Sequence, residues 1–188
     1  MHLDKHVVKM ILEYAQLLST AHRVLDGNPI TGLSKSGRKQ QQYILPDSRN
    51  SIMYSSTHVN HPSAIWVRQS YANYVWLSKL LTELCGEYTY RYGKVHKVER
   101  DGLEEELMYP PNNIPLFDQG SNLKKFTEPT PAMPDEVKVL REVATDRYEI
   151  DSISSYHNYY INNKSHIAKW TKRQMPVWYS EGIKSAVI

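Results

Sequence analysis

Apolar residues recur at helical spacing along three parts of the chain, and this pattern predicts three long helices. The first spans residues 4–25 and ends before Gly27 and Pro29, residues that commonly follow a helix C-terminus. The second spans residues 60–92 and the third spans residues 151–172. The chain is therefore expected to adopt a mainly α fold, a compact multi-helix domain.

Two segments between these helices lack a helical period. Residues 26–59 are rich in Gly, Ser, Lys, Arg and Gln, with β-like pieces at 42–45 and 51–54, and predict a long irregular loop with at most a small β-hairpin. Residues 109–134 hold six of the ten prolines, a density that disfavours regular structure. A further helix is expected after Pro134, where two acidic residues favour a first turn.

Composition is typical of one globular domain, residues 1–188. With 188 residues, 40% of them hydrophobic, the chain is long enough to build its own core. Cys85 is the only cysteine, which excludes an intramolecular disulfide and a Cys-rich zinc site. Lys9 and Glu13 interrupt the apolar residues near the start, and no run approaches the roughly 18 apolar residues of a membrane span. We expect a soluble, cytoplasmic protein with no membrane partner.

Charge and aromatic content narrow the class of ligand. The net charge is only +3, whereas a dedicated duplex-DNA binder carries a stronger basic footprint. One or two phosphates need only a few cations, so this charge favours a small phosphate-bearing ligand. The chain has 14 Tyr and 4 Trp against 2 Phe, so most rings carry a polar group that suits a partly wet surface.

The first helix carries a narrow polar stripe. At 100° per residue, its polar side chains fall within one arc, and they are His2, His6, Lys9, Glu13, Gln16 and Thr20. Because most other positions are apolar, the helix is expected to be buried on several sides and to turn this stripe toward a cleft. An ordinary solvated face with a Lys9–Glu13 pair is the alternative. The two histidines lie one turn apart, but no third ligand is evident, and we predict no metal site.

Three further groups combine cations with aromatic rings or a helix start. They lie at residues 58–68, 87–97 and 156–173. A helix N-terminus attracts anions, and aromatics interleaved with Lys and Arg suit base stacking with phosphate neutralisation. Ordinary core helices show the same interleaving. The candidate ligand-binding residues of these groups are His61, Arg68, Arg91, Tyr159, Tyr160, Asn163 and Lys164.

Several signatures of cofactor and nucleophile chemistry are missing from the sequence. It contains no Walker phosphate loop, no dinucleotide glycine fingerprint, no Gly-x-Ser-x-Gly elbow and no Cys-x-x-Cys pair. We therefore predict no cofactor. Cys85 lies in an apolar helix and is expected to be a core residue.

The residues Asp-Lys-His-Val-Val-Lys-Met-Ile-Leu-Glu at 4–13, continuing to Arg23, resemble a family of uncharacterised tailed-phage proteins. The resemblance extends through residues 60–66, 88–96 and 158–179. Members of that family begin with a short strand-like segment upstream, so an edge element is expected to be missing here. The resemblance implies a phage-encoded protein acting in the host cytoplasm.

More distantly, the Asp-, Lys- and His-rich first helix, followed by a His61-Pro62 helix with an early Trp66, is similar to the pyrimidine-dimer DNA glycosylase (endonuclease V) family. That resemblance implies a compact helical fold and a DNA-lesion substrate. It also implies that an amine acts as nucleophile beside a helical glutamate, a role that would fall to Glu13.

These observations lead to one expected function and two alternatives. The expected function is a phage-type protein that binds a phosphate-bearing nucleotide ligand between the first two helices and the C-terminal Tyr-, Asn- and Lys-rich segment, sequestering a host immune nucleotide signal. The first alternative is a DNA N-glycosylase/AP lyase acting on damaged or modified pyrimidine bases, with Glu13 as acid or base and Lys9 or the terminal amine as nucleophile. The second is an interaction module without a small ligand. A homo-oligomer is compatible with the sequence.

Overall fold

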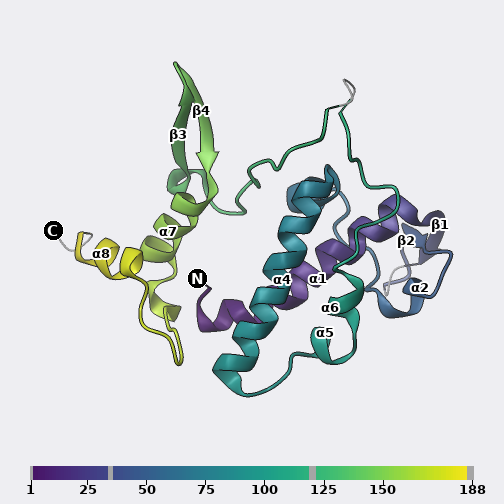
Figure 1. The fold of residues 1–188 in the computed structure, drawn as a ribbon, viewed down its shortest axis with the longest axis horizontal. Coiled ribbons are helices and arrows are strands. Elements are labelled where there is room, and N and C mark those ends of the chain that lie inside the picture. The colour runs from purple at the N-terminus through teal and green to yellow at the C-terminus, as the bar shows by residue number, and fades with distance from the viewer. Residues whose placement is uncertain (1, 34–35, 119–121, 186–188) are drawn as a thin grey trace. The chain divides into compact units, whose positions relative to one another are not determined.

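A computed structural model describes residues 2–33, 36–118 and 122–185 and is mainly α (Figure 1). The described residues form eight α-helices and two small antiparallel hairpins. The chain divides into two compact units, one comprising Met1–Val7 with Glu128–Ile188 and the other Val8–Thr127. The first helix, α1 (Asp4–Asp26), begins in the smaller unit and continues in the larger one. The organisation as a single domain stays a prediction.

The larger unit is built from helices and one hairpin. Its elements after α1 are β1 (Asn28–Leu33), β2 (Lys39–Ile44), α2 (Arg49–Ile52), α3 (Pro62–Arg68), α4 (Tyr71–Tyr92), α5 (Lys97–Arg100) and α6 (Leu103–Glu106). Residues at helical spacing on α1 and α4 form the core, among them Ile11, Ala15, Leu18, Tyr74, Leu77 and Leu81. The predicted first helix is confirmed, ending one residue later than expected.

Arg23, near the end of α1, ties the following segment back onto the helix. Its guanidinium donates to the backbone oxygen of Tyr43 at 3.0 Å, of Met53 at 2.8 Å and of Tyr54 at 2.5 Å. It also donates to the Asn50 side chain at 2.9 Å. Because a guanidinium offers five donors in a fixed fork, one side chain positions the whole stretch from β2 to Tyr54.

The segment 26–59, predicted as a loop with at most a small hairpin, contains a hairpin and also a short helix. The strands β1 and β2 pair from Asn28↔Ile44 to Leu33↔Lys39. The β-like piece at 42–45 overlaps β2, whereas the piece at 51–54 is wrong, because Arg49–Ile52 forms the short helix α2. In the described part of 109–134 the structure has no helix or strand apart from an isolated bridge, Phe117↔Leu123.

The predicted helix at 60–92 is two helices. Helix α3 ends at Arg68, and the side chain of Ser70 accepts a hydrogen bond from the backbone N–H of Asn73 at 3.2 Å, which starts α4. Ser70 has extended backbone angles, as an N-cap requires. Because Ser70 caps α4 without interrupting the helical spacing of the apolar residues, that spacing predicted one continuous helix and did not reveal the break.

The smaller unit contains a hairpin where a helix was expected. After the 3-10 turn η1 (Asp135–Val137), the chain forms β3 (Val139–Ala144) and β4 (Arg147–Asp151), followed by α7 (Ser152–Asn163), η2 (Ser165–Ile167) and α8 (Val177–Ser185). The prediction of a helix after Pro134 is therefore wrong, because a 3-10 turn and a hairpin follow this proline. Asp146 turns the hairpin at φ +58°, a conformation that Asp tolerates better than most residues.

The helix predicted at 151–172 ends early. Helix α7 stops at Asn163, and one 3-10 turn and an irregular stretch follow it. The core of this unit is Leu3, Tyr160, Trp170 and Tyr179. Trp170 therefore belongs to the core although it lies in an irregular stretch. Its position in the apolar repeat had led to the prediction that the helix continued to residue 172.

Candidate functional site

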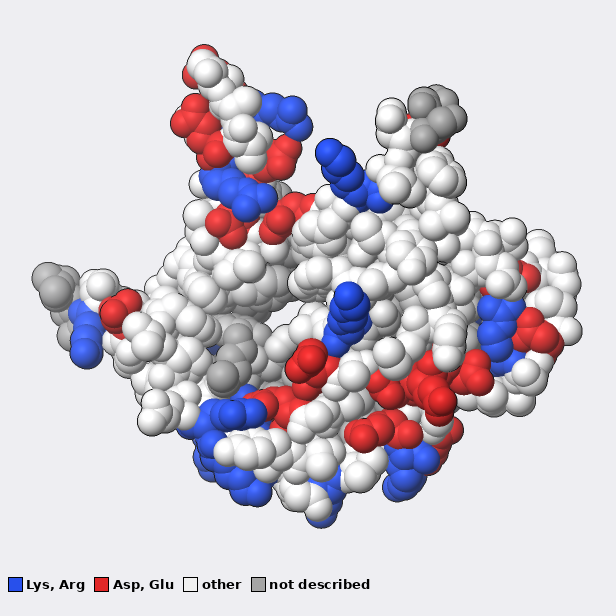
Figure 2. Space-filling view, in the orientation of Figure 1, with Lys and Arg blue, Asp and Glu red and all other residues white. Residues whose placement is uncertain are grey.

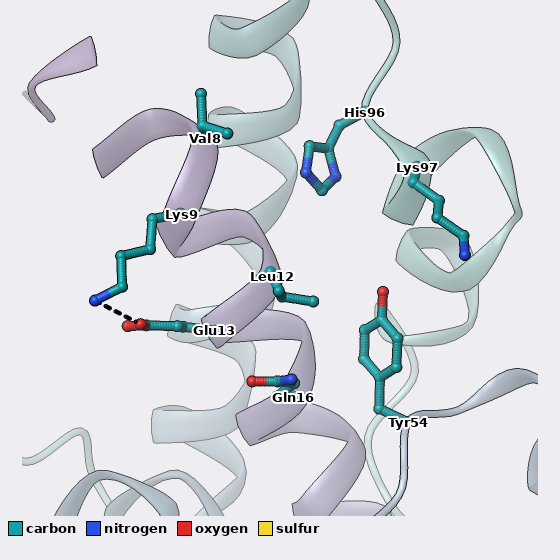
Figure 3. A pocket seen from close by; sticks show the side chains of 8 residues that line it. All are labelled: Val8, Lys9, Leu12, Glu13, Gln16, Tyr54, His96 and Lys97. Atoms are coloured by element: carbon teal, nitrogen blue, oxygen red, sulfur yellow. Dashed lines mark ion pairs between the residues drawn. The ribbon is translucent and has the colours of Figure 1, made fainter. Parts of the chain in front are cut away.

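A cleft of about 470 Å³ runs along α1 in the larger unit (Figure 3). It is lined by Val8, Lys9, Leu12, Glu13, Gln16, Tyr54, His96 and Lys97. These residues come from three parts of the chain: α1, the segment after α2, and the start of α5. The cleft therefore depends on the tertiary fold and is shaped by side chains that are far apart in the sequence.

One bank of the cleft carries an ion pair. Lys9 Nζ lies 3.0 Å from Glu13 Oε1, one helical turn along α1, and both side chains are well exposed, Lys9 to 67%. Beside them, Leu12 and Val8 expose 41% and 44% of their surface. In Figure 3, Leu12 points toward the ring of Tyr54. The floor is thus apolar and its edge is charged.

Tyr54 forms the opposite bank. Its backbone oxygen accepts the hydrogen bond from Arg23, which fixes the position from which the ring enters the cleft. Burial, with a contribution from the nearby Asp101 carboxylate, raises the pKa of the Tyr54 phenol above its usual value. The phenol therefore remains neutral near pH 7, so it can both donate and accept a hydrogen bond while its ring offers a stacking surface.

His96 adds a hydrogen-bond donor to the same bank. Its Nδ1 accepts from the backbone N–H of Val98 at 3.2 Å, and its ring meets Tyr88 edge-on. Burial lowers the pKa of His96, so the neutral ring predominates at pH 7. Because Nδ1 is the acceptor, the hydrogen of the neutral ring is on Nε2. This Nε2–H is the one hydrogen-bond donor of the neutral ring, and a ligand in the cleft can accept from it.

A second concavity adjoins the first. It has a volume of about 340 Å³ and is lined by Ser51, Ile52, Tyr54, Lys97, Val98, Asp101 and Leu103. Tyr54 and Lys97 line both concavities. The two spaces therefore meet at these two side chains, between α1 on one side and α2 and α6 on the other.

The structure brings together only part of the predicted site. In the larger unit, Lys9, Glu13 and Gln16 line the cleft, whereas Thr20 is buried beside Thr57. His96 and Lys97 belong to the predicted group at 87–97, although neither was among its candidate ligand-binding residues, and Tyr54 was not predicted.

The other candidates of the larger unit lie outside both concavities and have structural contacts. His61 caps α3 by accepting from Ser63 N–H at 3.2 Å. Arg68 donates to the backbone oxygens of Val59 and Ala64, both at 2.8 Å. Arg91 is buried and pairs with Glu87 at 2.6 Å. Each residue stabilises its own helix or the turn next to it, which explains its presence without a ligand.

The remaining candidates lie in the smaller unit. His6 Nδ1 is 2.7 Å from the Tyr160 hydroxyl, and burial raises the pKa of that phenol. Lys164 lies over the ring of Tyr159, 5.0 Å from its centroid. His2 is partly buried, and Asn163 is exposed at the end of α7. The predicted residues thus fall into two groups, one in each compact unit.

Metal and thiol chemistry find no support among the described residues. Within 2–33, 36–118 and 122–185, no three His, Cys, Asp or Glu side chains are arranged to share a metal ion. Cys85 is buried, and burial raises the pKa of its thiol to about 12. No helix in the described part of the chain has the length and apolarity needed to span a membrane.

Comparison of this chain with protein-family models, curated proteins and solved structures gives no match. The geometry of the cleft therefore carries the functional argument.

Proposed function

We propose that the protein binds a small phosphate-bearing ligand with a planar base, a nucleotide, in the cleft along α1. The observation that carries this proposal is the combination of an exposed apolar floor at Leu12 with a facing Tyr54 ring and a lysine on each bank. Ligand sites are mostly apolar with a few placed polar groups, and this cleft has that composition.

The base is placed between Leu12 and Tyr54. Both present flat or apolar surface to the cleft, and stacking of a base on an aromatic ring stabilises binding by about 1–3 kcal/mol. Gln16 at one end of the floor and His96 at the other supply an amide and an imidazole N–H for the polar edge of the base. Stacking gives affinity, and these two groups orient the ring.

Phosphate groups are placed at Lys9 and Lys97, whose ammonium groups lie on opposite sides in Figure 3, so that each lysine meets a different phosphate. Each lysine has a carboxylate partner, Glu13 at 3.0 Å and Asp101 at 3.9 Å, and all four side chains are at least two-fifths exposed. Exposed pairs of this kind contribute about 0–1 kcal/mol, so exchanging a carboxylate for a phosphate costs little. The lysines are therefore available to a ligand despite their ion pairs.

Binding without turnover suits a role in sequestration. The resemblance of residues 4–13 to tailed-phage proteins favours a ligand that belongs to the host, such as an immune nucleotide signal. Sequestration needs high affinity and slow release but no catalytic group. The proposed stacking and phosphate contacts would supply affinity, and none of them requires a chemical step.

The experiment is a panel of mononucleotides tested by thermal shift and isothermal titration calorimetry. Lys9→Gln removes the cation on the α1 bank, and Lys79→Gln on α4 removes an exposed lysine that lines neither concavity. We expect at least one nucleotide to raise the Tm, with Lys9→Gln weakening its affinity about tenfold and Lys79→Gln leaving it unchanged. If no nucleotide binds, or if both variants bind as the wild type does, the proposal is wrong.

A second candidate function rests on the amine and carboxylate of the same bank. Lys9 Nζ and Glu13 lie 3.0 Å apart, the arrangement in which a carboxylate can assist an amine of a DNA N-glycosylase/AP lyase. In that step the amine attacks C1′ of a damaged nucleoside, the bond from C1′ to the base breaks, and the base leaves. Catalytic lysines are usually desolvated, whereas Lys9 is 67% exposed, which favours binding over this chemistry. Borohydride reduction on lesion-containing DNA distinguishes the two, because only an imine-forming enzyme becomes covalently attached and Lys9→Gln would abolish that product.

A further inference from the structure

We propose that the ligand is a dinucleotide, with one nucleoside in the cleft along α1, the second in the adjoining concavity, and the phosphodiester between them at Lys97. This inference rests on the proposed function and names its ligand class. Its basis is that the two concavities share Tyr54 and Lys97. A ligand that fills both spaces must pass these two side chains.

The size of each space fits one nucleoside. The concavities measure about 470 and about 340 Å³, and sites for small ligands usually run from about 300 to 1,000 Å³. Each concavity alone has a volume near the lower end of that range, whereas a dinucleotide would fill both. Tyr54, at the boundary, offers its ring to the base on one side and its neutral hydroxyl to the linkage.

The second concavity has the chemistry of a nucleoside site rather than of a phosphate site. Asp101 places a carboxylate there and Ser51 a hydroxyl, while Ile52 and Leu103 supply apolar surface. A carboxylate repels phosphate but accepts hydrogen bonds from a ribose hydroxyl or a base N–H. The cation at the junction is Lys97, which is where the bridging phosphate would lie, and Lys9 on α1 would meet the terminal phosphate of the nucleotide in the first cleft.

The surroundings limit the length of the ligand. Acidic side chains gather over α5 and α6, next to the second concavity, and the first turn of α6 contains Glu104, Glu105 and Glu106 (Figure 2). A longer strand that left the second concavity over α6 would bring its next phosphate toward these carboxylates. The charge distribution therefore favours a ligand that ends in this concavity, a dinucleotide rather than a polynucleotide.

The test compares dinucleotides with mononucleotides on the full chain. Isothermal titration calorimetry is run with the four linear 5′-phosphorylated 3′,5′-linked homodinucleotides and the matching 5′-mononucleotides. We expect at least one dinucleotide to bind ten times more tightly than its mononucleotide. A mononucleotide that binds as tightly as its dinucleotide overturns this inference and leaves the proposed function intact, whereas absence of all binding removes both.

A filled second concavity provides the matched variant. Ser51→Trp places a large side chain in that concavity, and Ser48→Trp adds the same side chain at an exposed position just before α2 that lines neither space. We expect Ser51→Trp to bring the ratio of dinucleotide to mononucleotide affinity to about one, and Ser48→Trp to leave the ratio of the wild type. If Ser51→Trp binds the dinucleotide as much more tightly than the mononucleotide as the wild type does, the second nucleoside binds elsewhere, and the inference is also overturned.

Discussion

His22 and Tyr74, which are 52 residues apart in the sequence, share a 2.8 Å hydrogen bond inside the larger unit. Arg49 Nη1 lies 3.0 Å from the other ring nitrogen of His22, Nδ1. An arginine can only donate, so Nδ1 must accept and Nε2 must carry the hydrogen that is donated to Tyr74. The Tyr74 hydroxyl in turn donates to the backbone oxygen of Leu107 at 3.0 Å. The bonds thus run in one direction, from Arg49 to Leu107, and require a neutral histidine.

The first prediction is that stability falls in mild acid because of His22. Burial, with a smaller effect of Arg49, lowers the pKa of His22 from 6.5 to about 4 in the folded protein. Between these values the unfolded chain binds the proton and the folded protein does not, so the free energy of unfolding decreases as pH falls from 6.5 to 4. The full effect is about 3 kcal/mol. Urea unfolding at pH 7.5 and pH 4.5 measures it, and His22→Gln should remove most of the difference. An unchanged pH dependence in that variant would show that other groups cause it.

The second prediction concerns the Tyr74 hydroxyl. Tyr74→Phe removes the acceptor of the 2.8 Å bond from His22, so that the backbone oxygen of Tyr109 is left as the partner of the His22 N–H, and it removes the donor to Leu107 among fully buried side chains. We expect the free energy of unfolding to drop by about 1–3 kcal/mol, the cost of unsatisfied buried groups. Tyr71→Phe is the control, because Tyr71 is 45% exposed on the same helix. Equal stability of the two variants in urea would contradict the directed chain of hydrogen bonds.

The third prediction links Arg23 to the candidate site. Arg23→Lys keeps the charge but cannot serve the oxygens of Tyr43, Met53 and Tyr54 together. We expect a loss of roughly 3 kcal/mol, the value of one or two charge-assisted hydrogen bonds, and weaker nucleotide binding because Tyr54 is no longer held. Arg147→Lys, at a 71% exposed side chain, is the matched control. Normal affinity in a destabilised Arg23→Lys protein would show that Tyr54 is positioned by other contacts.

The fourth prediction uses two glycines that lie in helices. A Cβ at Gly182 in α8 would overlap the side chain of Ile161 on α7, whereas a Cβ at Gly86 in α4 meets no atom within 4 Å. Gly182→Ala should therefore destabilise the protein by about 1 kcal/mol, at the lower end of the cost of overpacking because the end of an isoleucine can shift. Gly86→Ala should stabilise it by about 0.5–1 kcal/mol through helix propensity. Thermal unfolding of the two variants checks both signs, and a stabilised Gly182→Ala protein would refute the close packing of α7 and α8.

The sequence by itself determined the helices whose bonds are local. The helix now seen at Asp4–Asp26 and most of Tyr71–Tyr92 follow from apolar spacing and from the residues at their ends, because each backbone bond joins positions four apart. The same periodicity also put Lys9, Glu13 and Gln16 on one face of the first helix, and these three residues line the cleft.

Only the tertiary structure decided what faces that stripe. Tyr54 reaches the cleft because Arg23 holds its backbone from 31 residues away, and Lys97 because a short helix starts beside it. Non-local bonds of this kind leave no period in the sequence, since they depend on how the chain folds back rather than on neighbouring residues. For the same reason the hairpin Val139–Asp151, whose strands stabilise each other by cross-strand pairing, was mistaken for the start of a helix.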